Sequence, residues 1–366
     1  MLMPVSGKVG YVVTTINPPT KAMQTLSQLL SDDLIQPGIV ADLDAGLRFR
    51  NSQVYVIADS KTPDPWSLDN CRYLSLSEQV NGIASLGRIL PTNSYARKMY
   101  GYLEAFREGC EWIRETDDDN IPLEIFLEAP SKTCSVRLVL ARESNWINIY
   151  SYFTKRRIWP RGLPLQVINQ IFIEPALVGE ALIEVENVAI YQALADGEPD
   201  VDALYRLTVE EESNIKFDPA NPLLIPKGVF TPFNSQATTW HTSIFPLMYL
   251  PITCSFRMTD IWRSFVVQRL LQATNFNFVV QGPQVFQERN PHNLMKDFED
   301  EIEGYLKNED IRILLQNTRV KGGAENFLED LHTLYESLVE ANYLHITELD
   351  FLTAWIRDVT ETGWSS

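Results

Sequence analysis

Short apolar runs separated by turn residues are the first regularity along the chain. In the first third these runs have the length of buried strands, and clusters of proline, glycine and polar residues bound them. We therefore predict strands over residues 8–16, 52–60, 71–77 and 110–117.

Two segments between these strands have the period of a helix. Thr20 is placed to cap a helix that continues to about residue 30. In the segment 93–109, apolar residues recur at helical spacing from Ala96 to Phe106, and Gly109 can end that helix. This alternation of strand and helix predicts an α/β fold with a mostly parallel central sheet and helices on both faces.

The middle of the chain mixes strand-like runs with proline-rich loops. The runs SVRLVLA (135–141), WINIYSYF (146–153) and QIFIEPAL (170–177) are interpreted as strands. One helix is clear from residue 259 onward, and Thr259 or Asp260 could cap it.

The last part of the chain has a different composition. Three acidic amphipathic segments, 296–308, 324–342 and 346–361, follow the last proline and predict helices. We therefore expect a main domain over residues 1–287 and a helical C-terminal region over residues 288–366.

Charge narrows the classes of partner. The 366 residues include 48 acidic and 31 basic side chains, a formal net charge of −17. Such a surface repels nucleic acid and anionic lipid, so neither is an expected partner. An anionic small molecule would need a local positive site or a metal ion.

Cysteine spacing and hydropathy indicate the compartment. The four cysteines are widely spaced and form no CxxC pair, which favours free thiols in a reducing compartment over a zinc site or a disulfide framework. The N-terminal segment is not typical of a signal peptide, and the longest apolar run, 244–252, is too short for a transmembrane segment. A cytoplasmic protein is expected.

Three adjacent aspartates, Asp117, Asp118 and Asp119, follow the strand predicted over 110–117. Ligands of such sheets bind at the carboxyl ends of the strands. A solvated turn is the alternative. In an extended chain Asp117 and Asp119 share one face, with Asp118 on the other, and a carboxylate pair suits Mn²⁺ or Mg²⁺ bridging to a diphosphate. We assign Asp117 and Asp119 to the metal.

Seven motifs in order resemble those of the STELLO-like family of glycosyltransferases and, more distantly, the reversibly glycosylated polypeptides or UDP-arabinopyranose mutases. They are VVTTINPPTKAM, NSYARKMYGYLEAFREG, ETDDDNIP, IWPRGLPL, DGEPDVDALYRLT, PFNSQ and TDIWRSF. The resemblance implies a GT-A-type nucleotide-sugar-binding fold, a nucleotide-sugar donor, with a UDP-sugar favoured, and a glycan or lipid-linked glycan acceptor. Plant members carry an N-terminal membrane anchor that this sequence does not show, so membrane anchoring is not expected.

The resemblance and the positions of the strand ends predict the same binding site for the donor. The end of the first strand would hold the base and ribose through Thr14, Thr15, Ile16 and Asn17. Asp59, at the end of the second strand, is a candidate for the ribose or the uracil edge, with a turn or cap role as the alternative. Arg97 could neutralise phosphate, unless it faces solvent on its helix. Asp118 is placed with the nucleotide.

Two loops supply further candidates. Trp159 and Arg161 lie in a loop with two prolines, and an aromatic ring beside a guanidinium suits sugar stacking and phosphate or carboxylate contact. A packed loop with a core tryptophan is the alternative. Asp200 and Asp202 alternate in the next motif, and the resemblance suggests contact with the donor sugar or the acceptor. A solvated acidic loop is the other interpretation.

Asp260 is the candidate general base, because transfer with inversion needs a carboxylate that takes a proton from the acceptor hydroxyl. A plain helix cap is the alternative. His241 could complete the metal shell, as a distant histidine does in some GT-A enzymes, or could be an ordinary packed residue.

Three functional hypotheses remain open at this point. The first is a metal-dependent glycosyltransferase, the second a UDP-sugar pyranose/furanose mutase that needs no acceptor, and the third an inactive scaffold of a glycan-assembly complex. A glycoside hydrolase also uses two carboxylates but needs no cluster of adjacent aspartates.

Overall fold

The computed structural model of the protein describes residues 7–35, 52–141, 144–173, 177–179, 181–209, 214–288 and 293–365. Among these residues, no helix combines the length and the hydropathy needed to cross a membrane.

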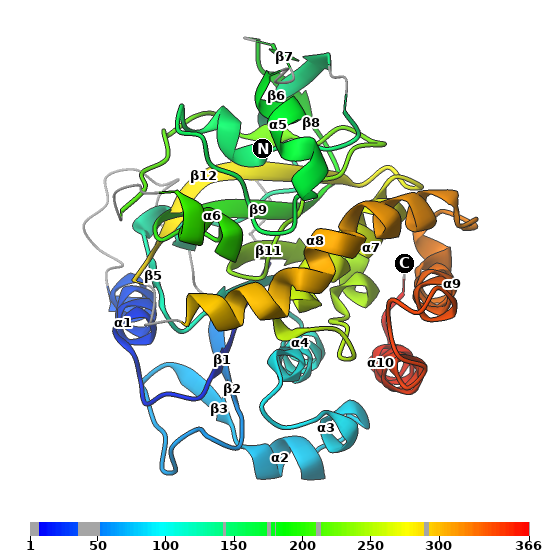
Figure 1. Cartoon of the computed structure of the whole chain (residues 1–366). Coiled ribbons are helices and arrows are strands. Elements are labelled where there is room, and N and C mark those ends of the chain that lie inside the picture. Colours follow the sequence, from blue (N-terminus) through cyan, green and yellow to red (C-terminus); the bar gives the residue numbers. More distant parts are fainter. Residues whose placement is uncertain are drawn as a thin grey trace.

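One large open sheet organises the molecule (Figure 1). Its strands follow the order β3-β2-β1-β4-β11-β9-β12-β10-β6-β7, with β5 paired to β12 and β8 paired to β6. The first four strands are parallel to one another, whereas β11 runs antiparallel to both of its neighbours. The sheet is thus parallel over its N-terminal part and mixed beyond β4.

The strands have the following bounds: β1 Val9–Thr15, β2 Gln53–Ala58, β3 Cys71–Leu74, β4 Trp112–Asp117, β5 Asn120–Pro122, β6 Cys134–Ala141, β7 Leu177–Val178, β8 Ile183–Val185, β9 Val188–Gly197, β10 Leu223–Leu224, β11 Ala237–His241 and β12 Asn277–Gln287.

The α-helices have the following bounds: α1 Lys21–Ile35, α2 Leu76–Asn81, α3 Leu86–Ile89, α4 Lys98–Arg107, α5 Leu165–Ile173, α6 Ala203–Thr208, α7 Thr259–Leu271, α8 Leu294–Asn317, α9 Phe327–Glu340 and α10 Glu348–Glu361.

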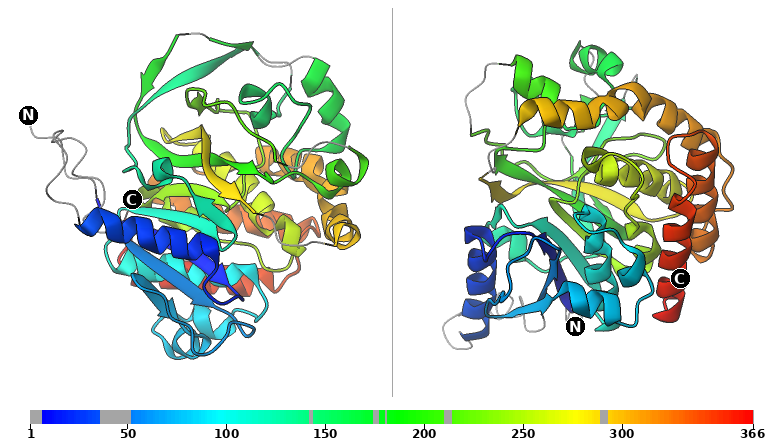
Figure 2. Two further views of the ribbon diagram at one scale, coloured as in Figure 1. Left: turned by 90° about the vertical axis from the view of Figure 1, so that its left-hand side faces the viewer. Right: turned by 60° about the horizontal axis from the view of Figure 1, so that its bottom comes forward.

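Both faces of the sheet are covered by helices, as predicted. Successive side chains of a strand point to opposite faces. Val13 of β1 therefore belongs to a buried cluster with Leu26 of α1, whereas Val12 belongs to a second cluster with Leu103 of α4. The helices α9 and α10 lie on the opposite side of the molecule from α1 (Figures 1 and 2).

Helix signals in the first third are confirmed at atomic detail. The Thr20 hydroxyl accepts from the backbone N–H of Met23, as a cap should. Gly109 follows α4 with a φ of 76°. Its positive φ is the left-handed conformation that ends many helices at glycine.

Two of the strand predictions in the middle of the chain are wrong. The run 146–153 forms a 3₁₀ turn over Ile149–Tyr152, because the Asn148 side chain accepts from the N–H of Tyr150 and starts a turn. Residues 170–173 of the run 170–177 lie in α5, which begins directly after Pro164, and Leu177 begins the short strand β7, whereas 174–176 lie outside the described residues. A short apolar run does not distinguish a strand from a buried helix.

The start of α7 also differs from the prediction. A 3₁₀ turn over Phe256–Met258 leads directly into α7, so Met258 occupies the cap position and makes no side-chain cap hydrogen bond. Thr259 and Asp260 lie inside the first turn of the helix, and Asp260 is therefore not its cap.

The predicted C-terminal helices form and pack on the rest of the molecule. One buried cluster joins Ile311 of α8, Leu331 of α9 and Trp355 of α10 to the core around α4 and α7. Three fully buried acids extend from these helices toward other elements: Glu301, Glu348 and Asp358.

Candidate functional site

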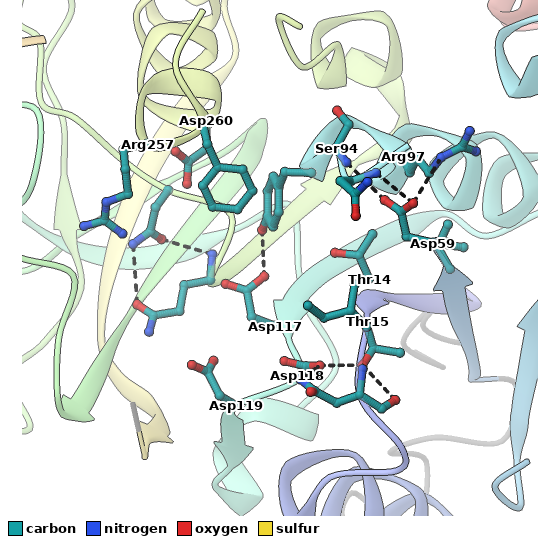
Figure 3. A pocket seen from close by; sticks show the side chains of 18 of the residues that line it. Thr14, Thr15, Asp59, Ser94, Arg97, Asp117, Asp118, Asp119, Arg257 and Asp260 are labelled. Carbon is teal, nitrogen blue, oxygen red and sulfur yellow. Dashed lines mark hydrogen bonds and ion pairs between the residues drawn. The ribbon is translucent and has the colours of Figure 1, made fainter. Parts of the chain in front are cut away.

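A pocket of about 470 Å³ lies at the carboxyl ends of β1, β2 and β4. Of the fifteen residues proposed from the sequence, twelve line it. They are Thr14, Thr15, Ile16, Asn17, Asp59, Arg97, Asp117, Asp118, Asp119, Arg161, Asp200 and Asp260. Figure 3 shows Arg257 and Asp260 across the pocket from Thr14, Thr15 and Asp59, with the three aspartates between them.

Asp118 joins the aspartate turn to the end of β1. Its Oδ2 accepts from the Thr15 hydroxyl at 2.5 Å and from the Asn17 side-chain amide at 3.0 Å. The backbone carbonyl of Asp118 accepts from the Thr20 hydroxyl at the start of α1. The loop after β1 is therefore held in one position relative to the aspartates.

Asp59 fixes the next wall of the pocket. Its carboxylate accepts from the backbone N–H groups of Asn93 and Ser94, at 2.8 and 3.0 Å. Arg97 supports the same loop, because its guanidinium donates to Gln79 Oε1 and to the carbonyl of Leu90, each at 2.7 Å. Arg97 is buried, and its guanidinium is used largely for these contacts rather than presented to a phosphate.

Asp117 is bound on one oxygen by a buried cation. Lys98, at the start of α4, is fully buried, and its Nζ lies 2.8 Å from Asp117 Oδ1. The Tyr95 hydroxyl donates to the same oxygen at 2.6 Å. Burial raises the pKa of Asp117, and the contacts with Lys98 and Tyr95 oppose that rise. Neither Lys98 nor Tyr95 contacts the second carboxylate oxygen of Asp117, Oδ2.

The negative charge of Asp119 is stabilised by fewer neighbouring groups than that of Asp117. Its Oδ2 accepts from the Gln287 side-chain amide at 3.2 Å. Burial, and then the charge of Asp117, raise the pKa of Asp119 to about 7. Asp117 and Asp119 each make ionisation of the other less favourable. A divalent cation between the two carboxylates would neutralise their charges.

No group of three or more His, Cys, Asp or Glu side chains with the arrangement of a metal site occurs within the described part of the chain. Mg²⁺ and Mn²⁺ need fewer protein ligands than such a group supplies, because Mg²⁺ is usually bound by one or two carboxylates together with substrate phosphates. Asp117 and Asp119 therefore fit such an ion only as part of a complex with a phosphate ligand.

Below the aspartates, a buried ion pair anchors β4. Arg263 of α7 donates two hydrogen bonds to the Glu115 carboxylate, at 2.6 and 3.0 Å, and both side chains are fully buried. Glu115 also accepts from Trp240 Nε1 at 2.8 Å and from the Tyr102 hydroxyl. Four elements thus meet on the residue two positions before Asp117.

Across the pocket, Arg161 binds two aspartates. Its Nε and Nη2 donate to Asp200 at 2.9 and 2.7 Å, and its Nη1 and Nη2 donate to Asp260 at 3.1 and 3.2 Å. Burial opposes ionisation of Asp200, but Arg161 and Arg257 outweigh it and hold the pKa of Asp200 below its ordinary value. Both aspartates are therefore held in fixed positions at the pocket wall.

Trp159 and Asp202 do not line the pocket. Trp159 lies in a packed loop, which was the alternative to sugar stacking, and the solvated-loop alternative for Asp202 is wrong because Asp202 is buried. Trp159 Nε1 donates to Asp202 Oδ2 at 2.6 Å, and the Trp159 ring packs edge-on against Tyr205. Asp202 is fully buried and caps α6 by accepting from the N–H of Tyr205. Burial raises the pKa of Asp202 to about 6.

His241 lies at the wrong end of the sheet for a metal ligand. It pairs with Trp112, the first residue of β4, whereas Asp117 is the last. Five residues of strand separate the two levels by roughly 16 Å. The His241 ring packs edge-on against Trp112 and contacts Ser243 and Glu111, so ordinary packing explains this residue.

Several lining residues were not selected from the sequence. They include Tyr95, Asn234, Gln236, Phe256, Arg257 and Gln287. Their partners lie far along the chain, and no local pattern identifies them.

Comparison with known proteins agrees with the motifs. Residues 257–366 match the family model described as STELLO glycosyltransferases. Two Arabidopsis thaliana proteins, "Probable glycosyltransferase STELLO1" and "Probable glycosyltransferase STELLO2", are 31% and 29% identical over 348 and 350 residues. Each alignment covers 88% of this chain and 43% of the relative, so the chain spans less than half the length of these relatives.

Solved structures align with most of the chain, but only at low TM-scores. Glucosyl-3-phosphoglycerate synthase from Mycobacterium tuberculosis, in complex with Mn²⁺, UDP-glucose and glycerol 3-phosphate, gives a TM-score of 0.40 at 12% identity, over 82% of this chain and 80% of that one. A mycobacterial protein gives a TM-score of 0.41 at 9% identity, over 82% and 74%. These scores are low, and the relationship rests on the sequence matches. The resemblance predicted from the motifs is confirmed by those matches: over most of its length the chain is similar to the STELLO glycosyltransferases.

Proposed function

We propose that the protein is a metal-dependent glycosyltransferase of the GT-A type that transfers a sugar from a nucleotide-sugar, with a UDP-sugar favoured, to a glycan or a lipid-linked glycan. One observation carries the proposal. A single pocket at the carboxyl ends of parallel strands collects Asp117, Asp119 and Asp260 beside the end of β1. The names of the two plant relatives agree with this activity.

The donor half of the pocket is formed by the ends of β1 and β2. Thr14, Thr15, Ile16 and Asn17 would contact the base and ribose, on a loop that Asp118 holds in place. Asp59 is engaged with the backbone of Asn93 and Ser94, so it would shape this half rather than bind the nucleotide through a free carboxylate.

Asp117 and Asp119 would hold Mn²⁺ or Mg²⁺ together with the diphosphate. When bound, such an ion stabilises the charge that develops on the leaving diphosphate. Lys98 and Tyr95 fix Asp117 through one oxygen and leave the other for this purpose.

Asp260 would act on the acceptor. Among the described residues, its Oδ1 accepts from Arg161 alone, so one lone pair remains on that atom. In a single displacement the acceptor oxygen bonds to the anomeric carbon, the bond from that carbon to the UDP oxygen breaks, and the acceptor proton passes to Asp260. UDP leaves with the bonding electron pair.

Calorimetric titration of UDP, GDP and CMP, each with Mn²⁺ and with EDTA, tests the proposal. We expect Mn²⁺-dependent binding of UDP that Asp119→Asn weakens by roughly 100-fold, about 2.7 kcal/mol. His241→Gln serves as the matched control and should bind UDP as the unaltered protein does. UDP affinity that is the same in EDTA, or unaffected by Asp119→Asn, would refute the metal site.

A further inference from the structure

An exposed aromatic ring stands at the acceptor side of the pocket. Phe256 lines the pocket and is 60% exposed, whereas most large apolar side chains of the described chain are buried. Fixed groups hold the segment on both sides of it. The Ser255 hydroxyl donates to the carbonyl of Asp300 at 2.5 Å, and Arg257 binds the fully buried Glu301 at 2.8 Å. The ring is therefore presented to the pocket by a rigid turn.

The surroundings of Phe256 are those of a carbohydrate subsite. The ring meets the edge of Tyr95, with centroids 5.9 Å apart, and it lies one helical turn before Asp260. Sugar-binding sites combine an aromatic face, which packs on the C–H groups of the ring, with a few convergent polar groups for the hydroxyls. Phe256 supplies the first element, and Asp260 with Arg161 and Asp200 supplies the second.

The charges of this half of the pocket argue against an anionic acceptor. Each arginine that lines it is already paired. Arg161 binds Asp200 and Asp260, Arg257 binds Glu301 and lies 3.7 Å from Asp200, and Arg206 binds Glu198 at 2.5 Å. Each of these three guanidinium groups therefore has a carboxylate partner, although Glu198 and Glu301 do not line the pocket themselves. Lys61, a further lining cation, follows β2 with Asp59 on the donor side.

We propose that Phe256, Asp260, Arg161 and Asp200 form the acceptor subsite, and that this subsite takes an uncharged pyranoside whose ring stacks on Phe256 and whose reacting hydroxyl is directed at Asp260. This inference rests on the proposed function and narrows its acceptor to a neutral sugar. A phosphorylated or carboxylated acceptor would find these arginines already paired with carboxylates, in a protein that is itself acidic.

The test is saturation-transfer NMR on the full chain with UDP and Mg²⁺ present. The probes are the methyl glycosides of glucose, galactose and mannose, and the 6-phosphates of the same three sugars. We expect saturation of ring protons in at least one neutral glycoside and none in the phosphates. Phe256→Ala should weaken binding of that glycoside by about tenfold, which is about 1.4 kcal/mol, because an aromatic contact is lost, and Phe256→Trp should preserve binding.

Controls separate this inference from the proposed function. UDP affinity and the melting temperature of Phe256→Ala should equal those of the unaltered protein, because the side chain is exposed and lies outside the donor half. If UDP fails to bind the unaltered protein, the proposed function fails whatever the glycosides do. If UDP binds but no neutral glycoside does, or a phosphate binds better, or Phe256→Ala leaves glycoside binding unchanged, the acceptor subsite is refuted.

Discussion

Each of the three adjacent aspartates has its own partners. Asp117 is bound by Lys98 and Tyr95, Asp118 by the loop after β1, and Asp119 by Gln287. Repulsion between neighbouring carboxylates is therefore offset separately at each position. It follows that substitutions at these three positions should have different consequences.

Asp118 should affect nucleotide binding without affecting its dependence on metal. In Asp118→Ala, Thr15 and Asn17 lose their shared acceptor, and the loop after β1 loses its fixed position. We expect UDP affinity to fall by roughly tenfold, about 1.4 kcal/mol, in Mn²⁺ and in EDTA alike. Calorimetry measures the ratio of the two affinities. If UDP bound Asp118→Ala equally well in Mn²⁺ and in EDTA, as expected for Asp119→Asn, Asp118 would be shown to bind the metal.

The pH dependence of stability should report the burial of Asp202. Its pKa is raised from 3.8 to about 6 in the folded state, so the folded protein binds a proton that the unfolded chain has released between these values. The stabilising contribution of Asp202 is therefore present at low pH and is lost as the pH rises through about 6.

Comparison with Asp202→Asn isolates this effect from other titrating groups. The unfolding free energy of the unaltered protein minus that of the variant should decrease by on the order of 3 kcal/mol between pH 4 and pH 7. Denaturant unfolding at each pH gives both values. A difference that is constant with pH would contradict the buried position of Asp202.

At the scale of elements, a helix of the C-terminal region caps a helix near the donor half of the pocket. Asp358 of α10 is fully buried and accepts from the N–H groups of Ser85 and Leu86, at 2.8 and 2.7 Å, and from the Ser85 hydroxyl. The chain then continues through α3 to Leu90, whose carbonyl accepts from Arg97. The loop beside Asp59 is thus supported from α10.

Removing this cap should loosen α3 in particular. Asp358→Ala leaves the buried backbone N–H of Leu86 and the partly buried N–H of Ser85 without an acceptor, and we expect a loss of roughly 2–3 kcal/mol of stability. Hydrogen exchange at Ser85 and Leu86 should accelerate. Asp350→Ala, an exposed position on the same helix, is the control and should change stability by only a few tenths of a kcal/mol. Equal protection at Ser85 in both variants would contradict the capping role.

Elements with strong local signals were predictable, and those defined by distant pairing were not. The parallel strands, α1, α4 and the three C-terminal helices follow from periodicity and caps. The mixed part of the sheet depends on contacts such as β11 beside β4, which no local pattern encodes. The same limit applies to the site. The three aspartates can be recognised in the sequence, but the sequence does not reveal that His241 pairs with the first residue of β4, at the end opposite Asp117.

At the scale of the whole molecule, the C-terminal helices are tied to the pocket by buried acids. Glu301 of α8 binds Arg257 and accepts from the N–H of Ala203 at the start of α6. Glu348 accepts from the N–H groups of Ile252 and Thr253 in the segment before Phe256. The segment that matches the STELLO family model begins at Arg257, so it includes the pocket residues Arg257, Asp260 and Gln287 together with all three helices.

A chain that ends at residue 287 should therefore not fold by itself. It would expose the apolar cluster shared with α8, α9 and α10 and would leave several buried donors without acceptors. We expect loss of the cooperative thermal transition by circular dichroism and loss of UDP binding. Cooperative unfolding of residues 1–287 with unchanged UDP affinity would instead establish an independent domain, and the full chain provides the reference.

The buried pair of Glu115 and Arg263 has a consequence for how this sequence can change over generations. Losing one partner leaves a buried charge uncompensated, at a cost of roughly 3–5 kcal/mol. Replacing both by apolar residues removes that charge but leaves the buried donors of Trp240 and Tyr102 without their acceptor. A lineage can therefore leave this arrangement only by nearly simultaneous substitution at two or more positions that are distant in the gene. Relatives should carry both residues or neither, and a natural sequence with one of them alone would mark a weakened or repacked descendant.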